Sequence, residues 1–167
     1  ILIIPNAIYN YYGDKRTIEK IYPTVEKYLT YLKTREDSTG LVTYGIGDWV
    51  FYKTQTPTAY TSSCFYYLDY ALMSRFAELT GRDSDKARYA QLAERTAEAF
   101  NRTYWNEQTG GYAANNQAAN SFALFLGIVD ETRIPRVVKN LADDVEKHDY
   151  HLTTGNLCTK YLMEMLT

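Results

Sequence analysis

The chain has 167 residues, with 18 Lys and Arg against 20 Asp and Glu, and therefore a formal net charge of −2. This balance argues against a nucleic-acid partner, because phosphate binding needs clustered cations, and no stretch reaches the ~18 apolar residues of a membrane span. The length fits a single segment or domain of ordinary size. With 17 tyrosines and a mean hydropathy of −0.41, many aromatic rings are expected at partly wet positions such as sugar-binding clefts, the alternative being tyrosines packed between amphipathic helices.

Hydrophobic residues recur at helical spacing along most of the chain, so the sequence predicts an all-α fold. The first helix covers residues 1–12 and ends at Gly13. The second begins after Asp14, which caps it, and runs to about Arg35, and Pro23 inside it predicts a kink or a new helical start. The first helix has no start signal and no basic leader region. We therefore expect an internal segment of a longer protein, cut within a helix.

Five further helices are expected. They cover about residues 61–80, 83–100, 116–126, 131–147 and 154–167. Residues 104–112 form at most a small hairpin, with its turn at Thr109-Gly110-Gly111. The odd-numbered helices are rich in apolar and small residues, whereas the even-numbered ones carry charged residues on an outer face. Inner and outer helices are therefore predicted to alternate.

Short and long connections alternate as well, the long ones being residues 36–60, 101–115 and 148–153. In a stack of antiparallel helical hairpins the long loops then gather on one face, where function is expected. This pattern predicts an α/α toroid, and a helical-repeat solenoid is disfavoured because no fixed repeat is visible. A closed six-hairpin toroid needs about twelve helices. We therefore expect an incomplete (α/α)6 toroid with an exposed apolar flank at each end.

The first long loop contains Tyr44-Gly45-Ile46-Gly47-Asp48-Trp49. Its glycines allow the backbone to turn tightly and to approach a ligand. Asp48 can accept hydrogen bonds from sugar hydroxyls, while the Trp49 indole offers a flat apolar face to a sugar ring. The alternative is structural: Asp48 caps a turn and Trp49 plugs the interior of the toroid. Composition alone does not separate the two interpretations.

The other long loops supply further candidates for ligand contact. Trp105 and Tyr112 in the second loop are predicted either to face the same opening as Trp49 or to hold a hairpin lid together. His151 in the third loop is either a ligand contact or an ordinary polar residue.

Residues that commonly bind metals or carry modifications are sparse. Cys64 and Cys158 lie outside any CxxC pattern and are interpreted as buried free thiols. His148 and His151 have no further ligand at metal-binding spacing, so no metal site and no cofactor are predicted. Asn101-Arg102-Thr103 matches a glycosylation acceptor, which we interpret as a chance match.

Several of these stretches, in this order, resemble the catalytic domain of bacterial α-L-rhamnosidases. They are Tyr44–Trp49, Phe100–Tyr104 leading into Thr109–Tyr112, Gln117–Ala119 with Leu124–Gly127, and His151–Gly155. The resemblance covers essentially all of residues 1–167 and implies a single segment of an (α/α)6 toroid that hydrolyses terminal α-L-rhamnosyl linkages with inversion. It further implies a rhamnose-containing oligosaccharide or glycoside as substrate, and the remainder of the catalytic domain as partner.

The resemblance also implies that the catalytic groups lie outside this chain. The acid of such enzymes belongs to an acidic, arginine-containing motif upstream, and the base is a glutamate in a Trp-flanked motif downstream; neither motif occurs here. The substrate-binding residues that it implies are Asp48, Trp49, Trp105, Tyr44, Tyr112 and His151. The alternatives are another α/α-toroid carbohydrate enzyme, such as a glucosidase or polysaccharide lyase, and a non-catalytic helical interaction module.

Overall fold

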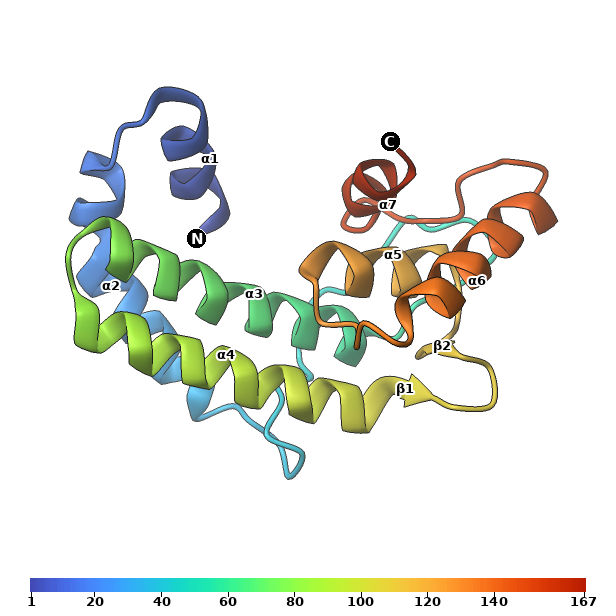
Figure 1. The fold of residues 1–167 in the computed structure, drawn as a ribbon, viewed down its shortest axis with the longest axis horizontal. Helices are drawn as coiled ribbons and strands as arrows, with labels where there is room; N and C mark the ends of the chain where they lie inside the picture. The colour runs from blue at the N-terminus through green and yellow to red at the C-terminus, as the bar shows by residue number, and fades with distance from the viewer. The chain divides into compact units, whose positions relative to one another are not determined.

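A computed structural model describes residues 1–167, which form seven helices and one two-stranded ribbon (Figure 1). The helices are α1 (Ile3–Tyr12), α2 (Arg16–Lys33), α3 (Thr58–Leu79), α4 (Asp83–Tyr104), α5 (Gln117–Leu126), α6 (Ile134–Lys147) and α7 (Thr159–Leu166). The strands β1 (Trp105–Asn106) and β2 (Gly111–Tyr112) are antiparallel, with Trp105 opposite Tyr112. The predicted helical class and the small hairpin are confirmed.

Residue contacts divide the chain into two compact units. The first comprises residues 1–42 and 65–98, and the second comprises residues 43–64 and 99–167. The prediction that residues 1–167 act as a single segment of one catalytic domain stays a prediction.

The first unit is built around a core to which α1, α2, α3 and α4 contribute. Its largest fully buried side chains include Leu2, Ile18, Tyr22, Tyr66, Tyr70, Met73 and Phe76. Burial of Ile18, Tyr22 and Val25 along one face keeps α2 a single helix through the exposed Pro23. The new helical start predicted at Pro23 is therefore absent.

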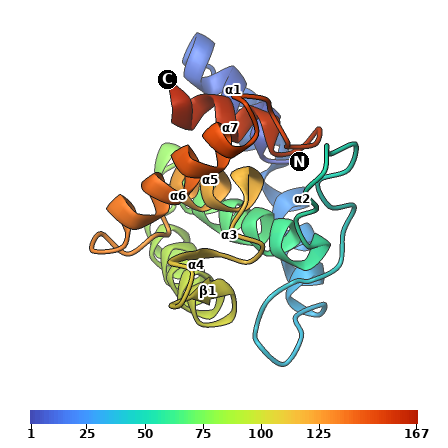
Figure 2. The ribbon, with the colours of Figure 1, turned by 90° about the vertical axis from the view of Figure 1, so that its right-hand side faces the viewer.

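In the second unit α5 is the central helix and packs against both α6 and α7 (Figure 2). Every side chain from Gln117 to Ala123 is buried. The Asn116 side chain accepts the N–H of Ala119 at the start of α5, and Gly127 ends the helix with a φ of 66°. By contrast, α6 buries only one face. This difference matches the predicted inner and outer helices.

Apolar side chains of α1 and α7 remain exposed. They are Ile3, Ile4, Tyr11 and Tyr12 in α1, and Met163, Met165 and Leu166 in α7. This exposure agrees with the apolar flanks expected of an incomplete toroid. None of the seven helices combines the length and the apolar composition that crossing a bilayer would require.

The last helix begins at Thr159, not near Thr154 as predicted, because a distant carboxylate binds the preceding turn. Asp48 Oδ2 accepts the N–H of Gly155 at 2.7 Å, and Asp48 Oδ1 accepts those of Leu157 at 3.0 Å and Cys158 at 2.9 Å. A helix N-terminus presents unpaired N–H groups and favours negative charge. Asp48 thus caps α7 from more than 100 residues away, and residues 156–158 stay in a turn.

Removing this cap should destabilise the second unit locally. In Asp48→Ala, three N–H groups lose their acceptor, and each buried unpaired group costs ~1–3 kcal/mol. We expect a stability loss of about 3 kcal/mol or more and faster hydrogen–deuterium exchange over residues 155–160. Asp143→Ala, which removes an exposed carboxylate of α6, is the control and should leave that segment protected. Unchanged exchange in Asp48→Ala would contradict the capping role.

Asp69 of α3 is a carboxyl group buried in the first unit, with 7% of its surface exposed. Burial raises its pKa from 3.8 to about 6, although a hydrogen bond from Tyr28 lowers the pKa. The folded protein therefore binds the Asp69 proton more tightly than the unfolded chain does. Its contribution to stability is complete below pH 4 and is lost as the pH rises through about 6.

Asp69→Asn should reveal this dependence, because asparagine resembles the protonated acid and does not titrate. A difference of about two pKa units corresponds to roughly 3 kcal/mol. Above pH 7 we expect the free energy of unfolding of the variant to exceed that of the unchanged protein by up to this amount. Below pH 4 we expect no such gain. Urea unfolding between pH 4 and pH 8 measures the gain, with Glu94→Gln on the exposed face of α4 as control. An equal gain at both ends of the range would refute the burial argument.

Candidate functional site

Two loops of the second unit meet where Asp48 caps α7. We call residues 43–57 the Trp49 loop and residues 148–158 the His151 loop. The Trp49 carbonyl accepts the N–H of Asn156 at 3.0 Å, and the Tyr52 N–H donates to the Thr153 carbonyl at 3.1 Å. The two loops are therefore joined through their main chains as well as through the Asp48 carboxylate.

Gly155 makes this close approach possible. A Cβ atom at this position would lie 2.3 Å from the Trp49 carbonyl oxygen and 2.8 Å from Asp48 Oδ1. Both are shorter than any normal contact, so a side chain would push the loops apart. Nothing near Gly155 in the chain reveals which backbone it touches, so this role of Gly155 was not predicted.

The buried Gln117 side chain ties the His151 loop to the start of α5. Its Nε2 donates to the His151 carbonyl at 3.1 Å, and its Oε1 accepts the Thr153 N–H at 3.0 Å. On the other side, the Thr56 hydroxyl donates to Asn116 Oδ1 at 3.1 Å. Both loops are thus anchored to the first turn of the central helix. Gln117 was not among the predicted site residues, although it belongs to the stretch that carried the family resemblance.

The anchored Trp49 loop exposes large side chains. Tyr44 has 84% and Trp49 has 59% of its surface exposed, and Ile46, Val50 and Tyr52 are also exposed. Val50 and Lys53 have positive φ values of 62° and 61°, which non-glycine residues rarely adopt. An exposed apolar surface on a fixed loop is typical of a contact site for a ligand or a partner.

A pocket of about 460 Å³ lies beside this surface. It is lined by Tyr52, Lys53, His148, Asp149, His151 and Leu152. His148 Nδ1 lies 2.7 Å from the Asp144 carbonyl oxygen, and His151 Nδ1 lies 3.1 Å from the His148 carbonyl oxygen. A carbonyl only accepts, so each Nδ1 donates its proton, and the Nε2 atoms are left for other partners. This arrangement provides polar contacts next to exposed aromatic rings.

The structure assigns a role to Asp48 of the Asp48-Trp49 pair. Asp48 is 3% exposed and its carboxylate accepts three main-chain N–H groups, as expected for a structural cap. Trp49 has 59% of its surface exposed in residues 1–167, and both a ligand contact and a position inside the closed toroid stay predictions for it. The direct hydrogen bond from Asp48 to a sugar hydroxyl stays a prediction.

Trp105 and Tyr112 are held in a different set of contacts. Trp105 Nε1 donates to Glu107 Oε2 at 2.7 Å, and the Arg133 guanidinium lies 4.5 Å from the centre of the Trp105 ring. The Tyr112 ring meets the Trp105 ring edge-on, with centroids 5.3 Å apart. These contacts hold the two rings against the hairpin and against Arg133 before α6, as the hairpin interpretation expects. A shared opening with Trp49 stays a prediction.

Tyr112 is fully buried, and its hydroxyl donates to Asn101 Oδ1 at 2.5 Å. Burial raises the pKa of Tyr112 to about 12. Asn101 Nδ2 in turn donates to the Ile128 carbonyl at 2.9 Å. The amide that glycosylation would modify is therefore engaged inside the protein, which agrees with a chance motif.

The thiols of the second unit are unsuited to nucleophilic chemistry. Cys64 and Cys158 are free and buried, and burial raises the pKa of both thiols. Residues 1–167 contain no group of three or more His, Cys, Asp or Glu side chains that could hold a metal ion. What the two loops offer is a binding surface of aromatic and polar groups.

Known proteins resemble this chain along its whole length. The sequence model of the bacterial alpha-L-rhamnosidase six-hairpin glycosidase domain matches residues 1–167. The α-L-rhamnosidase of Streptomyces avermitilis is 29% identical over 164 residues, which are 98% of this chain and 16% of that protein. An α-L-rhamnosidase of Formosa agariphila is 25% identical over 178 residues, covering 99% of this chain and 19% of that protein.

Solved structures agree with the sequence comparison. The Streptomyces avermitilis α-L-rhamnosidase complexed with L-rhamnose matches with a TM-score of 0.92 and 28% identity, over 99% of this chain and 16% of that one. The α-L-rhamnosidase of Dictyoglumus thermophilum matches with a TM-score of 0.90 and 33% identity, over 99% of this chain and 20% of that one. The chain thus spans about a fifth or less of the length of these relatives, and the predicted toroid architecture is confirmed. It belongs to the bacterial α-L-rhamnosidase six-hairpin glycosidase domain family.

Proposed function

We propose that this chain is one segment of the catalytic domain of an α-L-rhamnosidase, which removes terminal α-L-rhamnose with inversion, and that it supplies walls of the sugar subsite. One observation carries the assignment of the subsite. The Asp48 carboxylate fixes the Trp49 loop against the His151 loop, so the exposed Trp49 indole is presented on a rigid support. A rigidly held aromatic face suits a sugar ring, whose C–H groups are apolar.

The predicted residues have different roles in the proposed sugar subsite. Trp49 stacks on the rhamnose ring, and Tyr44 and His151 line the same subsite. Asp48 acts as a positioning residue through the α7 cap. Trp105, supported from its edge by Tyr112, forms a more distant aromatic wall.

The catalytic acid and base belong, in this proposal, to the parts of the parent protein outside residues 1–167. Inverting hydrolysis requires two carboxyl groups about 6.5–9.5 Å apart, one to protonate the leaving oxygen and one to activate water. The Asp48 carboxylate accepts hydrogen bonds from three main-chain N–H groups, and the Glu107 carboxylate accepts one from the Trp105 indole. The substrate would be a rhamnose-containing oligosaccharide or glycoside, and the partner would be the remainder of the catalytic domain.

Trp49→Ala in the full-length protein should weaken substrate binding. An aromatic stacking contact contributes about 0.5–1.5 kcal/mol, so we expect KM for a chromogenic α-L-rhamnoside to rise up to about tenfold. Tyr31→Ala is a matched control, because Tyr31 of α2 is also 59% exposed but lies outside both loops. It should leave KM within about twofold.

The same assay tests the activity itself. Faster turnover of an aryl glucoside than of the α-L-rhamnoside would favour another toroid carbohydrate enzyme. Equal KM values for Trp49→Ala and the unchanged protein would remove Trp49 from the subsite.

Residues 1–167 alone should be catalytically silent. A positioned acid or base typically contributes 10²–10⁴-fold, and this segment is proposed to hold neither. The segment would be assayed beside its full-length parent with the chromogenic α-L-rhamnoside, while circular dichroism verifies its helix content. Turnover near the parental rate would mean that Asp48, Glu107 or Asp149 performs the chemistry.

A further inference from the structure

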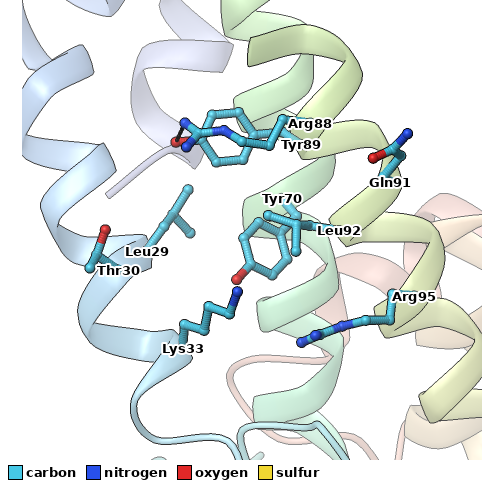
Figure 3. A pocket seen from close by; sticks show the side chains of 9 residues that line it. All are labelled: Leu29, Thr30, Lys33, Tyr70, Arg88, Tyr89, Gln91, Leu92 and Arg95. Carbon is cyan, nitrogen blue, oxygen red and sulfur yellow. Dashed lines mark hydrogen bonds between the residues drawn. The ribbon is translucent and has the colours of Figure 1, made fainter. Parts of the chain in front are cut away.

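A second pocket, of about 510 Å³, lies in the first unit between α2 and α4 (Figure 3). It is lined by Leu29, Thr30, Lys33, Tyr70, Arg88, Tyr89, Gln91, Leu92 and Arg95. The pocket shares no residue with the Trp49 loop or the His151 loop. Its volume falls in the range of small-molecule sites, about 300–1,000 Å³.

The floor of this pocket is apolar and aromatic. Leu29, Tyr70 and Tyr89 are buried, and Leu92 is half-buried. The proton of the Tyr70 hydroxyl is already used. Tyr66 donates its own proton to Glu36 at 2.7 Å, so in the 2.6 Å contact between the two hydroxyls Tyr70 is the donor. Tyr70 can therefore offer no hydroxyl proton to an anion in the pocket, to which it contributes its ring.

The rim of the pocket carries three cations and no carboxylate. Lys33 comes from α2, and Arg88 and Arg95 come from α4. Figure 3 shows Lys33 and Arg95 reaching toward the Tyr70 ring from different sides.

The three cations differ in how far they are already neutralised. Arg88 lies 4.5 Å over the Tyr89 ring and pairs with Asp85 at 3.1 Å and with Glu26 at 3.6 Å. Arg95 forms an ion pair with Glu36. These carboxylates hold the guanidinium groups in place from outside the pocket lining. Lys33 has no ion pair. It is the rim cation whose charge remains available to a ligand.

We propose that this pocket binds a small organic anion with a flat apolar body, namely an aromatic carboxylate. The Lys33 ammonium contacts the carboxylate, and the Arg95 guanidinium adds a second charge-assisted contact. Leu29, Leu92 and the two tyrosine rings contact the apolar body. The small size of the pocket and its closed floor suit a single aromatic acid better than an extended acidic peptide.

Titration calorimetry with 4-hydroxycinnamate tests the proposal on the full-length protein that carries this chain. Saturating L-rhamnose is present, so that the proposed sugar subsite is occupied. We expect a Kd of about 1 mM or tighter. The neutral amide of the same probe should bind about tenfold more weakly, because it keeps the ring but loses the charge.

Substitutions in α2 locate the binding. Lys33→Glu should weaken binding at least about tenfold, and Thr30→Trp, which fills the pocket from its rim, should abolish it. Lys27→Glu makes the same charge change on the same helix, at an exposed residue outside the lining, and should leave Kd within about twofold.

Two results would overturn the proposal. The first is no binding by the unchanged protein, which includes the case that another part of the polypeptide covers the pocket. The second is equal weakening by Lys33→Glu and Lys27→Glu, which would indicate general charge attraction instead of a site. Unchanged circular dichroism and melting temperature of the variants would show that they are folded.

Discussion

Three main-chain N–H groups at the start of α7 converge on the carboxylate of Asp48, and the geometry of the second unit depends on this contact. A buried carboxylate is costly unless hydrogen bonds compensate its lost hydration. Here the donors are the N–H groups that the helix end would otherwise leave unpaired. One interaction therefore sets where α7 begins, holds the Trp49 loop against the His151 loop, and requires glycine at position 155.

In the cores of both units, buried tyrosines keep their hydroxyl groups hydrogen-bonded. Tyr22, Tyr60, Tyr66, Tyr70 and Tyr112 are fully or almost fully buried. Their hydroxyls are paired: that of Tyr22 with Asp85, that of Tyr60 with the Ala119 carbonyl, and that of Tyr112 with Asn101. The large number of tyrosines thus reflects packing between helices as well as exposed loop aromatics. Each ring contributes apolar burial while its hydroxyl fixes the register of a neighbouring element.

The chain belongs to the family but covers only 16–20% of the length of these α-L-rhamnosidases. In our proposal this segment supplies binding walls, while proton transfer belongs to other segments. A toroid assembled from hairpins permits such a division, because the loops of different hairpins meet at one face. The cationic pocket between α2 and α4 uses outer helices and depends on none of those loops.

Periodicity, glycine ends and the hairpin turn were readable from the sequence because they depend on neighbours within a few residues. Gly13 ends α1 where it was predicted, and α5 ends before Gly127 as the predicted range 116–126 implied. The start of α7, the contact of Trp105 with Arg133 and the role of Gln117 were not readable, because each rests on a contact between distant segments. By itself the sequence determined the helical class, the alternation of inner and outer helices and the family. Only the tertiary structure decided that Asp48 caps a helix while Trp49 faces solvent, because a carboxylate bonds whichever donors the fold brings to it.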